Sequence, residues 1–140
     1  MRVTATPSLD DQSDGEITSL FVYGGLMRGF DLHHYLASST FIDTGWTEGS
    51  LVELGRYPGL IDGPGKVKGE LHALHDTPAQ LEALDELEDF DPANPQASTY
   101  LRTICEVHLA NGSLARAWVY KYNLDLGRLA VIENGDWHHK

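Results

Sequence analysis

The chain has 140 residues, of which 41% are hydrophobic and 22% charged, and these values fit one globular domain with one hydrophobic core. Twenty-one acidic against ten basic side chains give a formal net charge of −11, which disfavours binding to phosphate backbones and anionic lipid surfaces. The apolar runs are too short to cross a bilayer, and no apolar segment follows Arg2 as a signal peptide would require. We therefore expect a cytoplasmic protein that binds neither nucleic acid nor membrane.

The N-terminal segment differs in composition from the rest of the chain. Residues 1–17 contain acids, Ser, Thr, Pro and Gly with little apolar content, which predicts a mobile arm ahead of a single domain over residues 18–140. The domain begins with a strand-like run over residues 20–23, and Gly24-Gly25 ends this run.

The middle of the chain predicts strands that bend. We expect a helix over residues 31–37, and then strands over 41–54, where glycines would let the chain curve. Turns are expected at Tyr57-Pro58-Gly59 and at Gly63-Pro64-Gly65. The second turn would lead into a strand over residues 67–74.

The strongest helix signal covers residues 78–88. Thr77 is a good N-cap, Pro78 suits the first helical position, and Gln80 would complete a capping box with Thr77.

Strands over residues 100–109 and 115–122 are expected to form a hairpin. Asn111-Gly112 would join them, because this dipeptide favours the positive φ angles of a type I′ turn. Many short strands and few helices predict an α+β domain, in which a curled or closed sheet packs against one or two helices.

Cysteine and histidine positions argue against thiol and metal chemistry. Cys105 is the only cysteine, so an internal disulfide and a thiolate metal cluster are excluded, and its alternation with apolar neighbours predicts a structural strand residue. The histidines lack the spacing of a metal-binding motif, and His72 and His75 would lie on opposite faces of a strand. We expect no metal site.

Glu88 is the most informative single residue. At about 100° per residue, Leu81, Leu84 and Leu87 form an apolar arc on the predicted helix, and Glu88 falls inside this arc. A carboxyl group in that position has its pKa raised by desolvation, as a general acid or base near neutral pH needs, unless it finds a partner. The structural alternative is that Glu88 turns to solvent at the helix end or pairs with Arg102.

The glycine pair is the second candidate feature. Gly24 and Gly25 directly follow a strand and would expose consecutive backbone N–H groups, which can hold a carboxylate or an oxyanion. The segment is neither a dinucleotide-binding nor a Walker glycine motif, so no nucleotide is implied. Taken alone, the pair is weak evidence, because most such pairs are simply turns.

Six short motifs follow one another along the chain: Tyr23-Gly24-Gly25-Leu26, Tyr57-Pro58-Gly59, Val67-x-Gly69-Glu70-Leu71, Leu84-Asp85-x-x-Glu88, Tyr100-x-Arg102 and Glu133-x-Gly135-Asp136-Trp137. In this order they resemble the γ-glutamylcyclotransferase-like superfamily, above all its small bacterial members and the γ-glutamylamine cyclotransferases. The resemblance covers residues 19–138.

The resemblance implies a small mixed β-barrel with flanking helices and a cavity at one mouth. It assigns proton transfer to Glu88, the residue that helical phase also singles out. It assigns contact with the glutamyl part of the substrate to one loop: Tyr23, Gly24, Gly25 and Leu26.

This chain departs from the family pattern at Gly25, where the family usually has Ser or Thr. The change removes a hydroxyl group but keeps the backbone N–H donors. Tyr57 and Tyr100 are further candidates for residues that line the pocket.

The reaction implied by the resemblance releases 5-oxoproline and a free amine from a γ-glutamyl amine or γ-glutamyl peptide. The substrate's own α-amino group attacks its γ-carbonyl carbon, so an enzyme of this cyclising acyltransferase or lyase type would need no cofactor. The alternative hypothesis is a non-catalytic module on the same fold that binds a small molecule or another protein.

Overall fold

The computed structural model describes residues 17–140. The predicted N-terminal arm lies outside this range except for Ile17, which is buried. The elements are β1 (Ser19–Val22), η3 (His33–Leu36), β2 (Thr40–Glu53), β3 (Pro58–Ala73), α1 (Thr77–Leu87), η4 (Pro95–Ala97), β4 (Tyr100–Leu109), β5 (Leu114–Tyr122), β6 (Ala130–Val131) and η5 (Trp137–His139), where η denotes a 3₁₀ helix. None of the helices in the described range is long and apolar enough to cross a bilayer.

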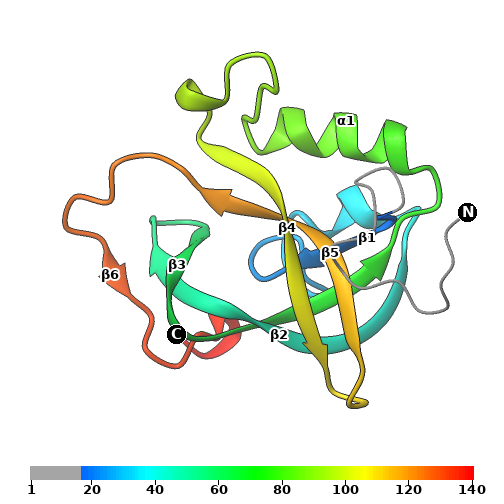
Figure 1. The fold of residues 1–140 in the computed structure, drawn as a ribbon, viewed down its shortest axis with the longest axis horizontal. Coiled ribbons are helices and arrows are strands. Elements are labelled where there is room, and N and C mark those ends of the chain that lie inside the picture. The colour runs from blue at the N-terminus through cyan, green and yellow to red at the C-terminus, as the bar shows by residue number, and fades with distance from the viewer. Residues whose placement is uncertain (1–16) are drawn as a thin grey trace, which may run out of the picture.

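Five strands close into a barrel, and α1 lies across it in the view of Figure 1. β1 pairs with β3, β3 with β2, β2 with β4 and β4 with β5, all antiparallel, and a parallel contact between Leu20 and Trp118 joins β5 back to β1. Closure leaves these five strands without a long free edge. The predicted mixed β-barrel is therefore confirmed, with one α-helix beside it in the described residues.

The long pair β2 and β3 bends at two irregularities in its register, between Phe41 and Asp43 and between Glu48 and Ser50. The predicted turn at Gly63-Pro64-Gly65 is wrong, because this segment lies inside β3. Such irregularities let a strand bend sharply without reversing. Glycine and proline therefore mark a bend here rather than the end of a strand.

The reversal between β2 and β3 lies slightly earlier than the sequence predicts. The backbone N–H of Leu54 donates to the carbonyl oxygen of Tyr57 at 3.2 Å, and β3 begins at Pro58. Of the three residues predicted as a turn, Tyr57 is the last residue of the turn, and Pro58 and Gly59 are the first two residues of β3.

The hairpin between β4 and β5 is confirmed, but its turn type is not I′. Gly112 has a φ of 94°, whereas Asn111 does not have a positive φ. The N–H of Gly112 donates to the carbonyl oxygen of Leu109 at 2.9 Å. The hairpin therefore has a longer loop than a two-residue turn, and its one residue with a positive φ is a glycine that follows the turn.

The helices also differ in detail from the sequence expectation. The predicted helix over residues 31–37 is the 3₁₀ helix η3. The N-cap of α1 is Asp76 rather than Thr77. The Gln80 side chain accepts hydrogen bonds from the backbone N–H groups of His75 and Asp76 at 2.8 and 2.9 Å, so it caps this end one residue earlier than expected.

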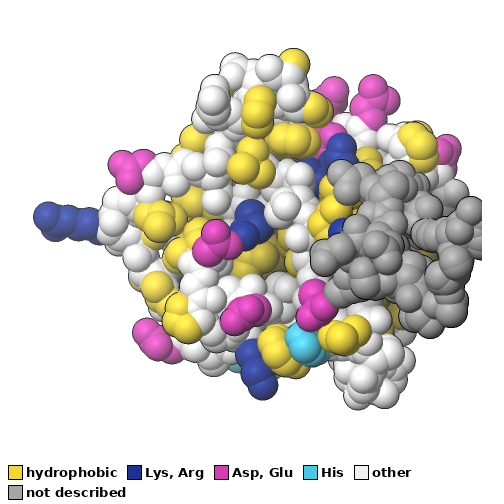
Figure 2. All heavy atoms as spheres, in the orientation of Figure 1, with side chains coloured by type: hydrophobic (Ala, Val, Ile, Leu, Met, Phe, Trp, Pro, Cys, Tyr) yellow, Lys and Arg dark blue, Asp and Glu magenta, His cyan; other side chains and the backbone are white. Residues whose placement is uncertain are grey.

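The barrel interior is filled from each of the five barrel strands and from α1. The least exposed aliphatic residues include Leu20, Leu51, Val67, Leu84, Val107 and Val119. Acidic side chains are spread over the face shown in Figure 2 rather than gathered in one patch. On this face the negative charge is therefore distributed rather than concentrated at one site.

Gly69 fits where β1 and β3 approach most closely, and this predicts a large effect of substitution. A Cβ atom at Gly69 would overlap the carbonyl oxygen of Val22 and lie 2.6 Å from Cζ of Phe21. We expect Gly69→Ala to lower the free energy of unfolding by about 3 kcal/mol, measured by urea denaturation.

Gly29→Ala is the control, because Gly29 has a φ of 89° but no atom within 4 Å of a Cβ. Its expected loss, from backbone strain alone, is about 1 kcal/mol. Equal losses for the two variants would contradict the close approach at Gly69.

Candidate active site

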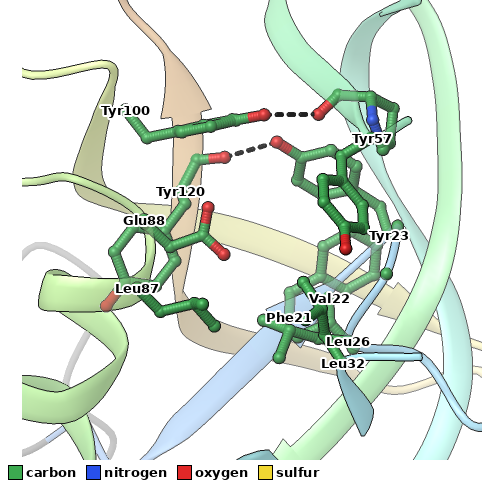
Figure 3. Close-up of a pocket in the computed structure, with 13 residues that line it drawn as sticks. Phe21, Val22, Tyr23, Leu26, Leu32, Tyr57, Leu87, Glu88, Tyr100 and Tyr120 are labelled. Atoms are coloured by element: carbon green, nitrogen blue, oxygen red, sulfur yellow. Dashed lines mark hydrogen bonds between the residues drawn. The ribbon is translucent and has the colours of Figure 1, made fainter. Parts of the chain in front are cut away.

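A cavity of about 210 Å³ opens where the end of α1 faces β1 and the turn after it (Figure 3). Its floor consists of buried residues: Phe21, Val22, Tyr23, Gly24, Gly25, Leu26, Pro58 and Tyr120. Its mouth consists of half-buried residues: Leu32, Tyr57, Leu87, Glu88 and Tyr100. Among these lining residues only Glu88 carries a formal charge, so the cavity is apolar with a single carboxyl group.

The seven candidate site residues named from the sequence all line this cavity: Tyr23, Gly24, Gly25, Leu26, Tyr57, Glu88 and Tyr100. They lie on segments far apart in the chain, and closure of the barrel brings these segments together. Tyr120 and Leu32 also line the cavity, but neither stands out in the sequence pattern of its own strand or loop.

Glu88 owes its position to the way α1 ends. It is the C-cap residue, and Asp89 after it is left-handed, with a φ of 58°. The N–H of Phe90 donates to the carbonyl oxygen of Asp85 at 2.8 Å, and that of Asp89 to Glu86 at 3.2 Å. These bonds form a Schellman motif, which fixes the last turn of the helix. The Glu88 carboxyl group then points into the cavity (Figure 3).

The Glu88 carboxyl group has no ion-pair partner in the described part of the chain, and no hydrogen bond to it is formed there. Burial alone raises its pKa to about 7. An apolar environment disfavours the charged form of a carboxyl group, and this shift brings the group into the range where it can both take and give a proton near neutral pH.

Asp85, one turn before Glu88, takes up the cation that could have paired with it. Arg102 Nε and Nη2 donate to the two carboxylate oxygens of Asp85 at 2.7 and 3.1 Å. The Tyr120 hydroxyl donates to Asp85 Oδ1 at 2.6 Å. The alternative in which Arg102 pairs with Glu88 is therefore wrong. The two carboxyl groups at this end of the helix thus have different surroundings: Asp85 has a cation and a hydroxyl donor, and Glu88 has neither among the described residues.

Tyrosine hydroxyl groups brace the walls of the cavity. Tyr23 donates to the carbonyl oxygen of Tyr120 at 2.5 Å and accepts from the N–H of Leu60 at 3.0 Å. Tyr100 donates to the carbonyl oxygen of Pro58 at 2.8 Å (Figure 3). Burial raises the pKa of Tyr23 and Tyr100, and the nearby Glu88 adds to both shifts. These hydroxyl groups therefore stay protonated and act as fixed donors.

Gly24 and Gly25 are required by space rather than by backbone conformation, since neither has a positive φ. A Cβ atom at Gly24 would lie 2.6 Å from Cδ of Pro58, and one at Gly25 would lie 2.7 Å from Cε1 of Tyr57. No hydrogen bond among the described residues uses the backbone N–H groups of Gly24, Gly25 or Leu26. The loop thus has three successive N–H groups available to a ligand.

The same loop is held from behind by a buried carboxylate of β3. Glu70 accepts from the backbone N–H of Arg28 at 3.0 Å, from its Nε at 3.3 Å and from His72 Nε2 at 3.0 Å. Burial alone would raise the pKa of Glu70, but the bonds from His72 and Arg28 outweigh it and lower the pKa. Glu70 therefore stays ionised and ties the loop to the barrel.

Cys105 packs against the core from β4, and its surroundings suit a structural role. Burial raises the pKa of the Cys105 thiol to about 12, so no reactive thiolate forms near neutral pH. Within residues 17–140 no cluster of three or more His, Cys, Asp or Glu side chains has a geometry that could hold a metal ion.

Comparison with known proteins identifies the family. The family model described as "Gamma-glutamyl cyclotransferase, AIG2-like" matches residues 20–139. The chain belongs to this family. The resemblance inferred from the six motifs is thereby confirmed.

Individual relatives agree with this family. The chain is 29% identical over 120 residues to the "Gamma-glutamylcyclotransferase family protein YtfP" of Escherichia coli strain K12, with 84% of this chain and 94% of YtfP covered. It is 33% identical over 109 residues to the "Gamma-L-glutamyl-butirosin B gamma-glutamyl cyclotransferase" of Niallia circulans, covering 76% and 68% of the two chains. The crystal structure of an AIG2-like protein from Mus musculus superimposes with a TM-score of 0.62 at 28% identity, covering 75% and 76%.

The pairing of Arg102 with Asp85 predicts a measurable loss when it is broken. Arg102→Met would leave the Asp85 carboxylate buried without its cation, so we expect the free energy of unfolding at neutral pH to fall by about 3 kcal/mol. Arg56→Met is the matched control, because Arg56 and Asp31 form an exposed pair, and its loss should be much smaller. Similar losses in urea denaturation would show that Asp85 does not depend on Arg102.

Proposed function

We propose that this chain is an enzyme that cyclises γ-glutamyl amines or γ-glutamyl peptides to 5-oxoproline and a free amine. The observation that carries the proposal is the Glu88 carboxyl group, which lies unpaired in an apolar cavity with its pKa raised to about 7. Membership of the family, and a relative whose name specifies γ-L-glutamyl-butirosin B, support a γ-glutamyl substrate.

The reaction needs only the substrate and one group that moves a proton. The α-amino nitrogen forms a bond to the γ-carbonyl carbon and closes a five-membered lactam, and the amide bond to the departing nitrogen breaks. Glu88 takes the proton that the attacking nitrogen loses and gives it to the departing nitrogen. The carboxyl group therefore ends in the form in which it began, and no water is consumed.

The rest of the cavity would hold the substrate in the cyclising conformation. The backbone N–H groups of Gly24, Gly25 and Leu26 are suited to bind the α-carboxylate or the oxyanion that develops on the γ-carbonyl oxygen. Holding the two reacting groups of one molecule together can supply several kcal/mol of the barrier. Tyr23 and Tyr100 would keep the walls in place, because their hydroxyl groups are bonded to backbone atoms of neighbouring strands.

Glu88→Gln tests this role, because the amide has the same shape but cannot exchange the proton. We expect it to lower kcat for the release of 5-oxoproline from a γ-glutamyl amide by about 100-fold or more, with an unchanged circular dichroism spectrum. Since the ionised form must accept the proton, kcat/KM of the unmodified protein should rise with pH and level off above about 7, the pKa of Glu88.

Glu82→Gln is the control, since Glu82 is exposed and lies on another face of α1. A Glu88→Gln variant with the rate of the unmodified protein would refute the role of Glu88. A protein that γ-glutamyl compounds stabilise against heating but that releases no 5-oxoproline would support the binding-module alternative instead.

A further inference from the structure

We propose that Tyr57 limits which leaving amines the cavity accepts, and that glycine at position 25 is what allows Tyr57 to occupy its place. This inference rests on the proposed cyclisation and adds a residue that selects among its substrates.

The layout of the cavity assigns the two halves of a substrate to different depths. The available N–H groups of Gly24, Gly25 and Leu26 belong to the buried floor, so the compact glutamyl part fits there. The departing nitrogen must lie near Glu88, which is at the half-buried mouth. Whatever is attached to that nitrogen then extends past the mouth, where Tyr57 stands across from Glu88 (Figure 3).

The Tyr57 ring fills the space that a side chain at position 25 would otherwise take. A Cβ atom at Gly25 would lie 2.7 Å from Cε1 and 2.8 Å from Cδ1 of Tyr57, and 3.2 Å from Cδ1 of Leu32. Gly25 has no positive φ, so its backbone would tolerate Ser or Ala. A side chain at position 25 and the Tyr57 ring therefore exclude each other in the present arrangement.

The position of the Tyr57 ring is also fixed by a hydrogen bond from its hydroxyl group. The Tyr57 hydroxyl donates to Asp31 Oδ2 at 3.0 Å, and Arg56 Nη2 donates to the same oxygen at 2.5 Å. Asp31 lies on the loop that begins with the glycine pair, and the N–H of the next residue, Leu32, donates to the carbonyl oxygen of Gly25 at 3.0 Å. One loop thus supplies both the gap for the ring and the acceptor for its hydroxyl group.

An anchored aromatic ring at the mouth discriminates by shape. Leu32 and Leu87 also line the half-buried part of the cavity, so the leaving group meets mostly apolar side chains there. We expect an amine whose nitrogen is attached to an unbranched carbon to pass, and one with branching at that carbon to be hindered. The γ-glutamyl amides of n-butylamine and tert-butylamine are suitable probes, because they are isomers that differ only in this branching.

The first test compares kcat/KM for the two probes in the unmodified protein and in Tyr57→Ala. The unmodified protein should prefer the n-butylamide by about tenfold or more, and Tyr57→Ala should reduce this preference by about tenfold, mostly by raising kcat/KM for the tert-butylamide. Tyr35→Ala is the control, since Tyr35 is an exposed tyrosine outside the cavity lining. An unchanged preference in Tyr57→Ala overturns the inference.

The second test asks whether positions 25 and 57 are matched. Gly25→Ser should lower the melting temperature by about 5 °C, and the double variant Gly25→Ser with Tyr57→Ala should melt close to Tyr57→Ala alone. Additive losses would show that the two side chains do not compete for space. If Gly25→Ser alone does not fold but the double variant does, this result also shows that the two side chains compete for space.

Turnover of the two probes separates failure of the proposed function from failure of the selection by Tyr57. If the unmodified protein turns over neither probe nor other γ-glutamyl amides, the proposed function is wrong and with it the selection of amines by Tyr57. If turnover occurs but the preference does not depend on Tyr57, only the present inference is wrong.

Discussion

The Glu88 carboxyl group is kept in an apolar cavity without a counter-ion, and the proposed chemistry depends on this. A carboxyl group beside an arginine would remain ionised and would be a poor proton donor near neutral pH. Arg102 could have been that arginine, but its guanidinium group donates two hydrogen bonds to Asp85 instead. The pairing of one acid on α1 therefore preserves the isolation of the other.

Closure of the barrel brings together the residues that surround Glu88. The parallel contact between β5 and β1 brings Tyr120 beside Tyr23, and the start of β3 carries Pro58 to Tyr100. Side chains from separate segments of the chain then surround the cavity into which the Glu88 carboxyl group points. The loop after β1 is held on its other side by Glu70, so both Glu88 and this loop are attached to the barrel.

Local patterns in the sequence predict the helix that ends at Glu88 and the strands β1, β4 and β5, whereas β3 is longer than they predict. The three-residue spacing of Leu81, Leu84 and Leu87 placed Glu88 on the inner face, and the structure agrees. The pattern could not say whether Arg102 would pair with Glu88 or with Asp85, because both acids lie on the same end of the helix. That choice depends on where β4 crosses α1, which is a property of the closed barrel.

Other details also depended on contacts between distant segments. Gly63-Pro64-Gly65 has the composition of a turn, but it lies inside β3, between Ile61 and Lys66, which both pair with β2. The composition of the Gly24-Gly25 segment suggests a tight turn that needs a positive φ, but the φ of Gly25 is not positive. The close approach of the Tyr57 ring explains why position 25 is glycine. A single sequence does not indicate which side chain, thirty or so residues away, will fill such a gap.

The proposed chemistry rests on burial without a partner, which raises the pKa of Glu88 to about 7 and lets its carboxyl group both take and give a proton near neutral pH. An NMR titration of the side-chain carboxyl carbons, with Glu88 assigned by its absence from Glu88→Gln, measures this directly. The account predicts a midpoint of about 7 for Glu88. A midpoint near 4.5, the ordinary value for a glutamate, would contradict it.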